Sequence, residues 1–357
     1  MQQLVQIRGR GTGANPANRF VQQDVVADGD WLDTLDDDEP GPRTQFLRDH
    51  TRGIIARNDS PDIPFTASVN PYRGCEHGCI YCFARPTHEY LGYSAGLDFE
   101  TRILVKHDAP ELLRRELAAK KWEPQPIAMC GVTDPYQPAE RKFEITRGCL
   151  EVLAEFRNPV AMVTKNHLVT RDIDVLGELA SHQAACVNLS ITTLDEKLQR
   201  VMEPRASTPA RRLEAVRKLS AAGIPVRVLV APVVPGLTDH EMPAILAAAA
   251  DAGAMAASYI PLRLPHGLKG LFEEWLETHF PDRKDKVLNR IREMRGGKLY
   301  NAEWGTRMRG EGVFADQYEA MFGALTRKLN LVRHIPTLST AAFRRVHTPA
   351  GQMGLFD

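Results

Sequence analysis

Hydrophobic residues along the chain gather in short runs rich in Val, Ile and Ala, and segments of helical periodicity separate these runs. Short continuous apolar runs are typical of strands buried on both faces, whereas apolar residues three and four positions apart indicate amphipathic helices. The strands are predicted at residues 68–73, 126–131, 160–164, 186–191, 226–230 and 256–260. The helices are predicted at residues 110–121, 146–156, 171–181, 209–222, 238–252 and 268–279.

The helix predicted at residues 209–222 carries the best-marked boundaries. Thr208 is a candidate N-cap, Pro209 occupies the first helical position, and Gly223 follows the last turn. Six strand-then-helix units in succession imply a parallel sheet, which is either an open barrel or a doubly wound sheet. A further strand is expected at residues 99–106, at an edge of the sheet.

Polar side chains follow most of the predicted strands. They are the three cysteines after the first strand, Thr133 and Asp134 after the second, Lys165 and Asn166 after the third, Ser190, Thr192 and Thr193 after the fourth, and Arg263 after the sixth. A β/α barrel builds its active site at the carboxyl ends of its parallel strands. This distribution therefore favours a barrel enzyme over a doubly wound sheet.

The composition indicates one main domain with a large core. The chain has 357 residues, of which 43% are hydrophobic. We find neither a leader-like apolar run at the start nor an uninterrupted apolar stretch long enough for a membrane span, so we expect a cytoplasmic protein. Six cysteines, three of them clustered, do not resemble a disulfide framework and indicate a metal site in a reducing compartment.

The zero net charge conceals an asymmetry along the chain. Residues 28–39 contain seven acidic residues and no basic one, and the Pro-Gly-Pro that follows indicates an exposed, poorly ordered segment. Residues 283–345 contain fourteen Lys or Arg against six Asp or Glu. This section is a candidate phosphate-binding face, and a solvated surface with scattered arginines is the alternative.

The stretch NPYRGCEHGCIYCFAR places Cys75, Cys79 and Cys82 in a C-x3-C-x2-C spacing. A zinc site would need a fourth ligand, which His77 or His88 could supply, but the paired knuckle that is usual in structural zinc sites is missing from the sequence. Iron–sulfur cubanes normally take four thiolates, so three cysteines would leave one iron open to an exogenous ligand. The cluster is the favoured interpretation.

The cysteine spacing, with Tyr81 directly before the third cysteine, resembles the hallmark of the radical S-adenosylmethionine (SAM) enzymes. Residues 9–20, 131–140, 163–174 and 203–239 further resemble the spore photoproduct lyase-like branch of that family. The resemblance implies a 4Fe-4S cluster bound by the three cysteines, whose open iron is chelated by the amino and carboxylate groups of SAM.

The resemblance also implies a fold, a partial (β/α)6 barrel of the α/β class. The expected organisation is an N-terminal extension with the acidic segment (1–66), the barrel (67–265), a mainly helical basic section (266–345) and a flexible tail (346–357).

Five further positions are expected around SAM because of the resemblance. Tyr81 should lie near the adenine. Thr133 and Asp134 stand where many family members have a Gly-Gly-Glu stretch, and they are candidates to bind the amino group. Lys165 and Ser190 resemble residues that hold SAM, and a cation at Lys165 suits its carboxylate.

Some positions leave two interpretations open. Cys130 resembles a lyase cysteine that returns a hydrogen atom to the product radical, but a buried small hydrophobe is the usual role of a strand cysteine. Glu203 and Arg205 bind a ribose or a substrate phosphate, or they form an ion pair beside the following helix.

One position departs from the lyase. The lyase has a tyrosine directly after the third cluster cysteine, where this chain has Phe83. Phenylalanine has no phenolic hydrogen to relay, which argues against thymine-dimer reversal.

The family chemistry is reductive cleavage of SAM to a 5′-deoxyadenosyl radical, which removes a hydrogen atom from the substrate. An external flavodoxin or ferredoxin is implied as the reductant, because the remaining cysteines are too dispersed to hold a second cluster. The branch and the basic section favour a nucleic-acid substrate, in a DNA repair-like lyase or modification reaction. A protein, peptide or small-metabolite substrate is the alternative, and a non-catalytic metal-binding module is a weaker one.

The last residues also carry a pattern. Gln352, Met353, Leu355 and Phe356 resemble the pentapeptide by which bacterial repair and replication proteins bind the DNA sliding clamp. Leu355 and Phe356 would fill an apolar pocket, while Gln352 would fix the register by hydrogen bonds. The alternative is that Leu355 and Phe356 fold back onto the barrel as a hydrophobic anchor.

Overall fold

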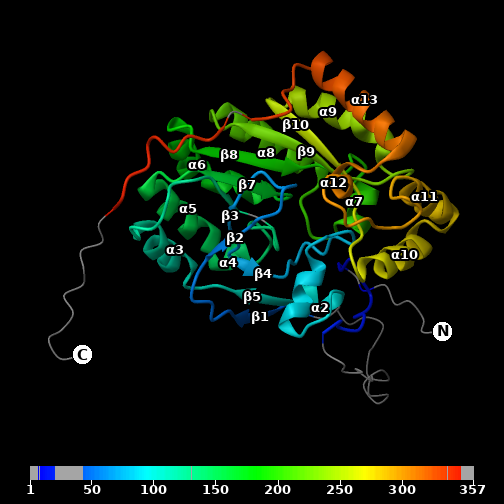
Figure 1. Ribbon diagram of the computed structural model, residues 1–357, viewed down its shortest axis with the longest axis horizontal. Coiled ribbons are helices and arrows are strands. Elements are labelled where there is room, and N and C mark those ends of the chain that lie inside the picture. Colours follow the sequence, from blue (N-terminus) through cyan, green and yellow to red (C-terminus); the bar gives the residue numbers. More distant parts are fainter. Residues whose placement is uncertain (1–6, 8, 21–42, 130, 336, 347–357) are drawn as a thin grey trace.

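The computed structural model describes residues 7, 9–20, 43–129, 131–335 and 337–346. Its main sheet consists, within these residues, of β2 (Ile55–Arg57), β3 (Ala67–Val69), β6 (Ile127–Met129), β7 (Val160–Thr164), β8 (Ala185–Ser190), β9 (Val226–Val233) and β10 (Ala256–Pro261). The spatial order is β10-β9-β8-β7-β6-β3-β2 (Figure 1). All neighbouring strands are parallel except β2 and β3, which are antiparallel.

The strand order decides between the two predicted sheet types. The parallel strands from β3 to β10 lie side by side in the order in which they occur in the sequence. A doubly wound sheet reverses its order at a switch point, whereas a β/α barrel adds each strand next to the previous one. The predicted partial barrel of six parallel strands is therefore confirmed.

Helices connect the strands and cover the sheet. Helices α6, α8 and α9 contact strands β8 and β9, and α3 packs against α5 (Figure 1). The helices up to the end of the barrel are η1 (Arg85–Leu91), α2 (Leu97–Thr101), α3 (Ala109–Ala118), α4 (Glu140–Phe143), α5 (Ile145–Phe156), η2 (His167–Asp172), α6 (Ile173–Ser181), α7 (Glu196–Met202), α8 (Pro209–Ala221), η3 (Asp239–Glu241) and α9 (Met242–Asp251).

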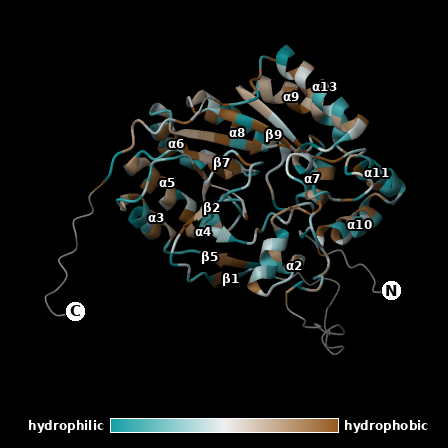
Figure 2. Ribbon diagram, viewed as in Figure 1, coloured by the Kyte–Doolittle hydropathy of each residue, from teal (hydrophilic) through white to brown (hydrophobic). Residues whose placement is uncertain are grey.

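The hydrophobic pattern explains why these segments form the core. All six residues of β8 are buried, as expected for a parallel strand covered on both faces, and the strands are mostly hydrophobic in Figure 2. Helix α8 begins as predicted, because the Thr208 side chain accepts a hydrogen bond from the Arg211 backbone N–H at 3.4 Å. Gly223 follows this helix in the left-handed conformation (φ 74°).

Two predicted strands differ from the structure. The run at 68–73 is split, because β3 ends before Pro71, which has no backbone N–H, and Tyr72–Arg73 form β4 in a second sheet. The strand expected at 99–106 is shorter, since α2 occupies residues up to Thr101. It does not lie at an edge of the main sheet: β5 (Arg102–Val105) is the central strand of the second sheet, between β4 and β1 (Gln45–Arg48).

The section after the barrel is helical, as predicted. It contains α10 (Leu268–His279), α11 (Pro281–Glu293), α12 (Thr306–Arg309) and α13 (Gly312–Lys328). Helices α10 and α11 pack against each other, and α13 packs against α9 and α11 (Figure 1). Among the described residues, none of the helices combines the length and the apolar character that a membrane span requires.

Candidate active site

The loop that carries the three cysteines follows β4 and ends in η1. It leaves β4 at Gly74, whose φ of 80° is left-handed and where a Cβ would lie 2.9 Å from the Phe99 carbonyl oxygen. The Cys75 backbone N–H donates to that same carbonyl at 2.9 Å. Cys75 and Cys79 are buried, Cys82 is partly exposed, and all three thiols are free of disulfides.

Hydrogen bonds from the Arg85 side chain stabilise this loop. Its buried guanidinium donates to the carbonyls of Cys79 at 2.9 Å and Gly78 at 3.1 Å, and it pairs with the buried Glu100 carboxylate at 2.5 Å. The Gly11 backbone N–H donates to the same carboxylate at 2.9 Å. Because a Cβ on Gly11 would lie 1.7 Å from the Gly78 carbonyl oxygen, only glycine fits. The amino-terminal segment is thus packed directly against the cysteine loop.

The three thiols have the chemistry of cluster ligands. Burial raises the pKa of Cys75, Cys79 and Cys82, so a thiolate at these positions needs a compensating positive charge, which an iron–sulfur cluster supplies. In the part of the chain that the structure describes, no three Cys, His, Asp or Glu side chains converge as ligands of one metal ion. In a 4Fe-4S cluster each thiolate would hold a different iron, so the three thiols need not share one metal ion. The donor set fits a 4Fe-4S cluster.

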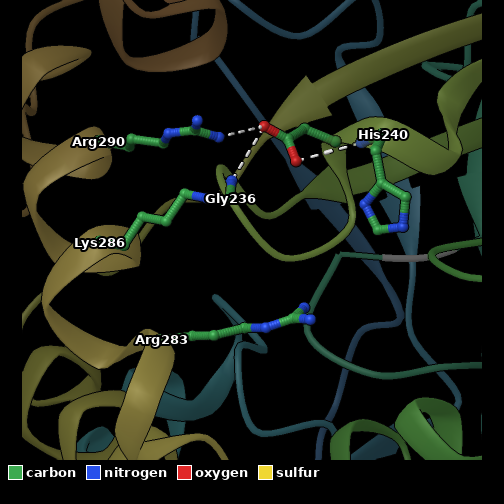
Figure 3. Close-up of a pocket in the computed structure, with 6 residues that line it drawn as sticks. Gly236, His240, Arg283, Lys286 and Arg290 are labelled. Carbon is green, nitrogen blue, oxygen red and sulfur yellow. Dashed lines mark hydrogen bonds and ion pairs between the residues drawn. The ribbon is translucent and has the colours of Figure 1, made fainter.

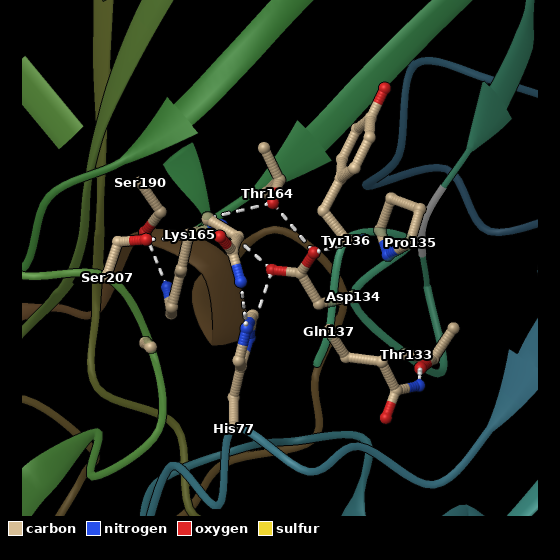
Figure 4. Close-up of polar contacts among 12 residues, drawn as sticks. His77, Thr133, Asp134, Pro135, Tyr136, Gln137, Thr164, Lys165, Ser190 and Ser207 are labelled. Carbon is tan, nitrogen blue, oxygen red and sulfur yellow. Dashed lines mark hydrogen bonds and ion pairs between the residues drawn. The ribbon is translucent and has the colours of Figure 1, made fainter. Parts of the chain in front are cut away.

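Asp134 lies at the centre of a buried polar network beyond β6 (Figure 4). One carboxylate oxygen accepts from the Thr164 hydroxyl at 2.7 Å and from the Tyr136 backbone N–H at 2.9 Å. The other accepts from the Lys165 backbone N–H at 2.8 Å and lies 3.3 Å from His77 Nδ1. Although burial opposes ionisation, His77 and the other donors lower the pKa of Asp134. Four neighbours therefore occupy this carboxylate, and its predicted contact with the SAM amino group stays a prediction.

Thr133 is engaged in a similar way. Its hydroxyl donates to the Gly74 carbonyl at 2.7 Å and accepts from the Gln137 amide at 2.8 Å, which links β6 to the start of the cysteine loop (Figure 4). The second nitrogen of His77 lies 3.1 Å from the Asn166 amide nitrogen. Hydrogen bonds of the Thr133 and His77 side chains therefore connect the cysteine loop to the carboxyl ends of β6 and β7.

Lys165 and Ser190, predicted from different strands, lie together. The Lys165 ammonium donates to the Ser190 hydroxyl at 2.6 Å (Figure 4). The same ammonium lies 5.6 Å from the centre of the Tyr81 ring. The Tyr81 hydroxyl donates to the Glu203 carboxylate, which also pairs with the Arg212 guanidinium. The structure thus brings three of the predicted SAM-binding side chains into one cluster.

This cluster carries a surplus of positive charge. Glu203 is fully buried, and although burial opposes its ionisation, Arg212 and Lys165 lower its pKa to about 2. Two cations then face one carboxylate, which suits the binding of a further anionic group. Arg205 pairs instead with Glu76 at 2.9 Å. Glu203 thus forms the ion pair expected beside the following helix, whereas Arg205 pairs with a residue of the cysteine loop, and a ribose or phosphate contact of either residue stays a prediction.

Sequence reasoning missed Arg212, although a signal was available. Ala215, Val216 and Leu219 are buried on α8, and Arg212 stands three, four and seven positions before them on the same stripe. A charged residue at a position that the helical period assigns to the core needs a buried partner. The pattern could have identified Arg212, but its partner Glu203 follows only from the fold.

Three predicted features lie outside the described residues. They are the acidic segment at residues 28–39, Cys130, which directly follows β6 in the sequence, and the carboxyl-terminal pentapeptide at residues 352–356. The expectations for all three stay predictions.

Two exposed aromatic rings lie next to arginines near the cysteine loop. We call Phe83, Arg263, Trp304 and Arg307 the aromatic–arginine surface. Phe83 is 54% exposed, and the Arg263 guanidinium lies 5.5 Å from its ring centre. Trp304 is 57% exposed, and the Arg307 guanidinium lies 3.9 Å from its ring centre. Burial lowers the pKa of Arg263, and the charge of Arg307 contributes to this lowering. The surface begins at the residue after the third cysteine.

Comparison with known proteins agrees with this geometry. The sequence model of the radical SAM superfamily matches residues 69–249. A protein of Mycobacterium tuberculosis described as uncharacterized is 38% identical over 234 residues, which cover 65% of this chain and 68% of that protein. An uncharacterized protein of Methanocaldococcus jannaschii is 30% identical over 173 residues, covering 48% of this chain and 62% of that protein.

Solved structures of spore photoproduct lyase share the fold. One lyase mutant has a TM-score of 0.57 and 17% sequence identity, over 82% of each chain. A second mutant, with bound AdoMet and dinucleoside spore photoproduct, has a TM-score of 0.56 and 16% identity, also over 82% of each chain. At this identity the likeness concerns the fold, whereas the sequence match covers the cysteine loop and most of the barrel. The chain belongs to the radical SAM superfamily.

Proposed function

We propose that this protein reductively cleaves SAM and uses the resulting radical on a nucleic acid, in a DNA repair-like lyase or modification reaction. Cys75, Cys79 and Cys82 would hold a 4Fe-4S cluster. When bound, this group supplies the electron that splits the SAM sulfonium into methionine and a 5′-deoxyadenosyl radical, which then takes a hydrogen atom from the substrate.

The residues around Lys165 would bind and orient SAM. The surplus positive charge of Lys165 and Arg212 over Glu203 suits the SAM carboxylate, and the Lys165–Ser190 contact of 2.6 Å holds the ammonium at the ends of β7 and β8. Tyr81 places its ring beside the same ammonium. Cys130 is the candidate that returns a hydrogen atom to the product, because it directly follows β6 in the sequence and resembles the lyase cysteine with that role.

The single observation that carries a nucleic-acid substrate is the aromatic–arginine surface. Large apolar rings are normally buried, and an exposed ring backed by a guanidinium offers a flat face on which a base can stack. Phe83, the residue directly after Cys82, offers such a face. A base on this surface would therefore lie beside the site where the radical forms.

The proposed setting follows from the chemistry. A flavodoxin or ferredoxin would deliver the electron, since the described cysteines outside the loop, Cys149 and Cys186, are buried separately in the core. A cluster with an open iron needs a reducing compartment, so we place the protein in the cytoplasm.

The test begins with anaerobic purification and reconstitution. A brown protein that forms 5′-deoxyadenosine from SAM under reductant is expected, whereas a colourless protein with one zinc and no SAM cleavage would overturn the proposal. Oligonucleotide binding, measured by fluorescence anisotropy over a salt series, should weaken as salt rises, because phosphate contacts release counterions. Absence of oligonucleotide binding would favour a peptide or metabolite substrate.

Ring deletions test the surface itself. Phe83→Ala and Trp304→Ala should each weaken oligonucleotide binding by about 1–3 kcal/mol, the range for a base stacked on an aromatic ring. Tyr90→Ala is the matched control, because Tyr90 is 72% exposed and its ring stacks on Phe20 instead. Equal losses in all three variants would contradict base stacking at this surface.

A further inference from the structure

A pocket of about 390 Å³ lies between the loop after β9 and helix α11 (Figure 3). Arg283, Lys286 and Arg290 enter it from one face of α11, since positions three, four and seven apart share a face of a helix. The imidazole of His240 faces them from the opposite wall. The pocket is lined by Gly236, Asp239, His240, Arg283, Lys286 and Arg290.

Asp239, an acidic residue that lines the pocket, already has hydrogen-bond partners within the protein. The Asp239 carboxylate accepts from the Arg290 guanidinium at 3.1 Å, from the Gly236 backbone N–H at 2.9 Å and from the Tyr318 hydroxyl at 2.9 Å. Arg283 and Lys286 form no ion pair with any described residue. Two exposed cations therefore face the hollow without a carboxylate of their own in the described part of the chain.

Arg290 is held in the pocket wall by contacts on two sides. Its guanidinium lies 5.0 Å from the centre of the Phe314 ring on one side and contacts Asp239 on the other. Gly236 is left-handed (φ 79°), and a Cβ there would lie 3.3 Å from Arg290 Cδ. Glycine therefore satisfies both the turn and the close approach of the arginine, which makes the pocket a formed feature of the fold.

Helix α11 also connects the pocket to the active site. Val287, Leu288 and Ile291, on its buried face, belong to the same hydrophobic cluster as Ile80 and Tyr81 of the cysteine loop. The basic face of α11 is consequently held in a fixed position relative to the loop. A ligand in the pocket would therefore stand at a defined place relative to the cysteine loop.

We propose that this pocket binds a backbone phosphate of the nucleic-acid substrate, an inference that rests on the proposed function. Two exposed cations, a buttressed arginine and an imidazole match the charge and the hydrogen-bonding capacity of a phosphodiester. The exposure of Arg283 and Lys286 leaves the bound group in contact with water, as the backbone of a long strand requires. The pocket positions the strand while the aromatic–arginine surface holds a base.

The test removes both exposed cations in the full-length, cluster-loaded protein. In Arg283→Gln, Lys286→Gln, binding of a single-stranded oligonucleotide should weaken, and the slope of log K against log salt should become less negative by about 0.7 for each phosphate that the variant no longer neutralises. The control is Arg327→Gln, Lys328→Gln, which removes the same charge from exposed residues roughly 20 Å along α13 from Phe314. Circular dichroism and melting curves verify that both variants are folded.

The outcomes separate this inference from the proposed function. If the unaltered protein binds the oligonucleotide and both double variants keep its slope and affinity, the pocket proposal fails while the nucleic-acid function stands. If the unaltered protein does not bind the oligonucleotide, the nucleic-acid function fails. Tripolyphosphate is the second probe, and its binding is measured by calorimetry. If the unaltered protein binds tripolyphosphate but no oligonucleotide, and only the pocket variant loses this binding, the ligand of the pocket is a free phosphate compound and not a phosphodiester.

Discussion

Glu203 and Arg212 form an ion pair in which both side chains are buried, and the Tyr81 hydroxyl donates to the same carboxylate. A buried charge is costly unless it is paired, so each member of the pair depends on the other. The pair connects α8 to the residue before the third cluster cysteine. Its loss should affect both the stability of the barrel and the shape of the site.

Glu203→Gln should reduce the free energy of unfolding at neutral pH by about 3–5 kcal/mol, because it leaves Arg212 buried without a counter-ion. The pKa of Glu203 is lowered from 4.5 to about 2, so its contribution is present above pH 4.5 and disappears as the pH falls towards 2. Denaturant unfolding of both proteins at pH 7 and pH 3 measures this. A difference that does not shrink at low pH would contradict the ionised pair.

Replacement of Cys75, Cys79 or Cys82 by alanine should abolish cluster binding and 5′-deoxyadenosine formation, because each thiolate would hold one iron. Iron and sulfide content, visible absorption and product chromatography measure the two effects. Cys149→Ala is the matched control, since Cys149 is a buried core residue. A full cubane retained in Cys79→Ala would disprove the ligand assignment.

Lys165→Met should raise the KM for SAM by about tenfold or more, which corresponds to loss of one charge-assisted hydrogen bond. The cluster itself should load normally, because Lys165 is not a ligand. Single-turnover assays over a range of SAM concentrations give the KM. An unchanged KM would show that the lysine serves only to neutralise Glu203, from which it lies 3.9 Å away.

Gly11→Ala should destabilise the protein by about 1–3 kcal/mol and shorten the lifetime of the cluster in air, because the new Cβ collides with the Gly78 carbonyl oxygen. Melting temperature and the decay of cluster absorption measure these effects. Gly177→Ala provides the control, since apart from its chain neighbours and the backbone of its own helix no atom lies within 4 Å of a Cβ at that position. Equal cluster lifetimes in the two variants would argue against a role of the amino-terminal segment at the site.

The carboxyl-terminal pentapeptide should bind the DNA sliding clamp at about micromolar strength, because the cost of ordering a short peptide offsets much of its contact energy. Leu355→Ala combined with Phe356→Ala should abolish this binding. Surface plasmon resonance with purified clamp compares the two chains. No binding by the unaltered chain, or equal binding by the variant, would refute the proposed partner and weaken the case for a DNA substrate.

Local sequence determined much of this protein. The cysteine loop is readable because its ligands lie within eight residues, the strand positions follow from short continuous apolar runs, and the helix positions follow from a hydrophobic period of 3.6 residues. Thr208 and Pro209 marked the start of α8 correctly because capping depends only on neighbouring residues. The polar residues Asp134, Lys165 and Ser190, which follow three of the predicted strands, were rightly expected at one edge, since parallel strands end on the same side.

The tertiary structure alone decided which distant residues meet. The contact of Gly11 with Gly78, the burial of Glu203 against Arg212, and the pocket between Gly236 and α11 all join segments that no local pattern connects. Likewise, Pro71 ends β3 locally, but only the tertiary structure pairs Tyr72 and Arg73 with β5 in a second sheet. Local propensity selects helices and strands, whereas the placement of charges in the site depends on how those elements pack.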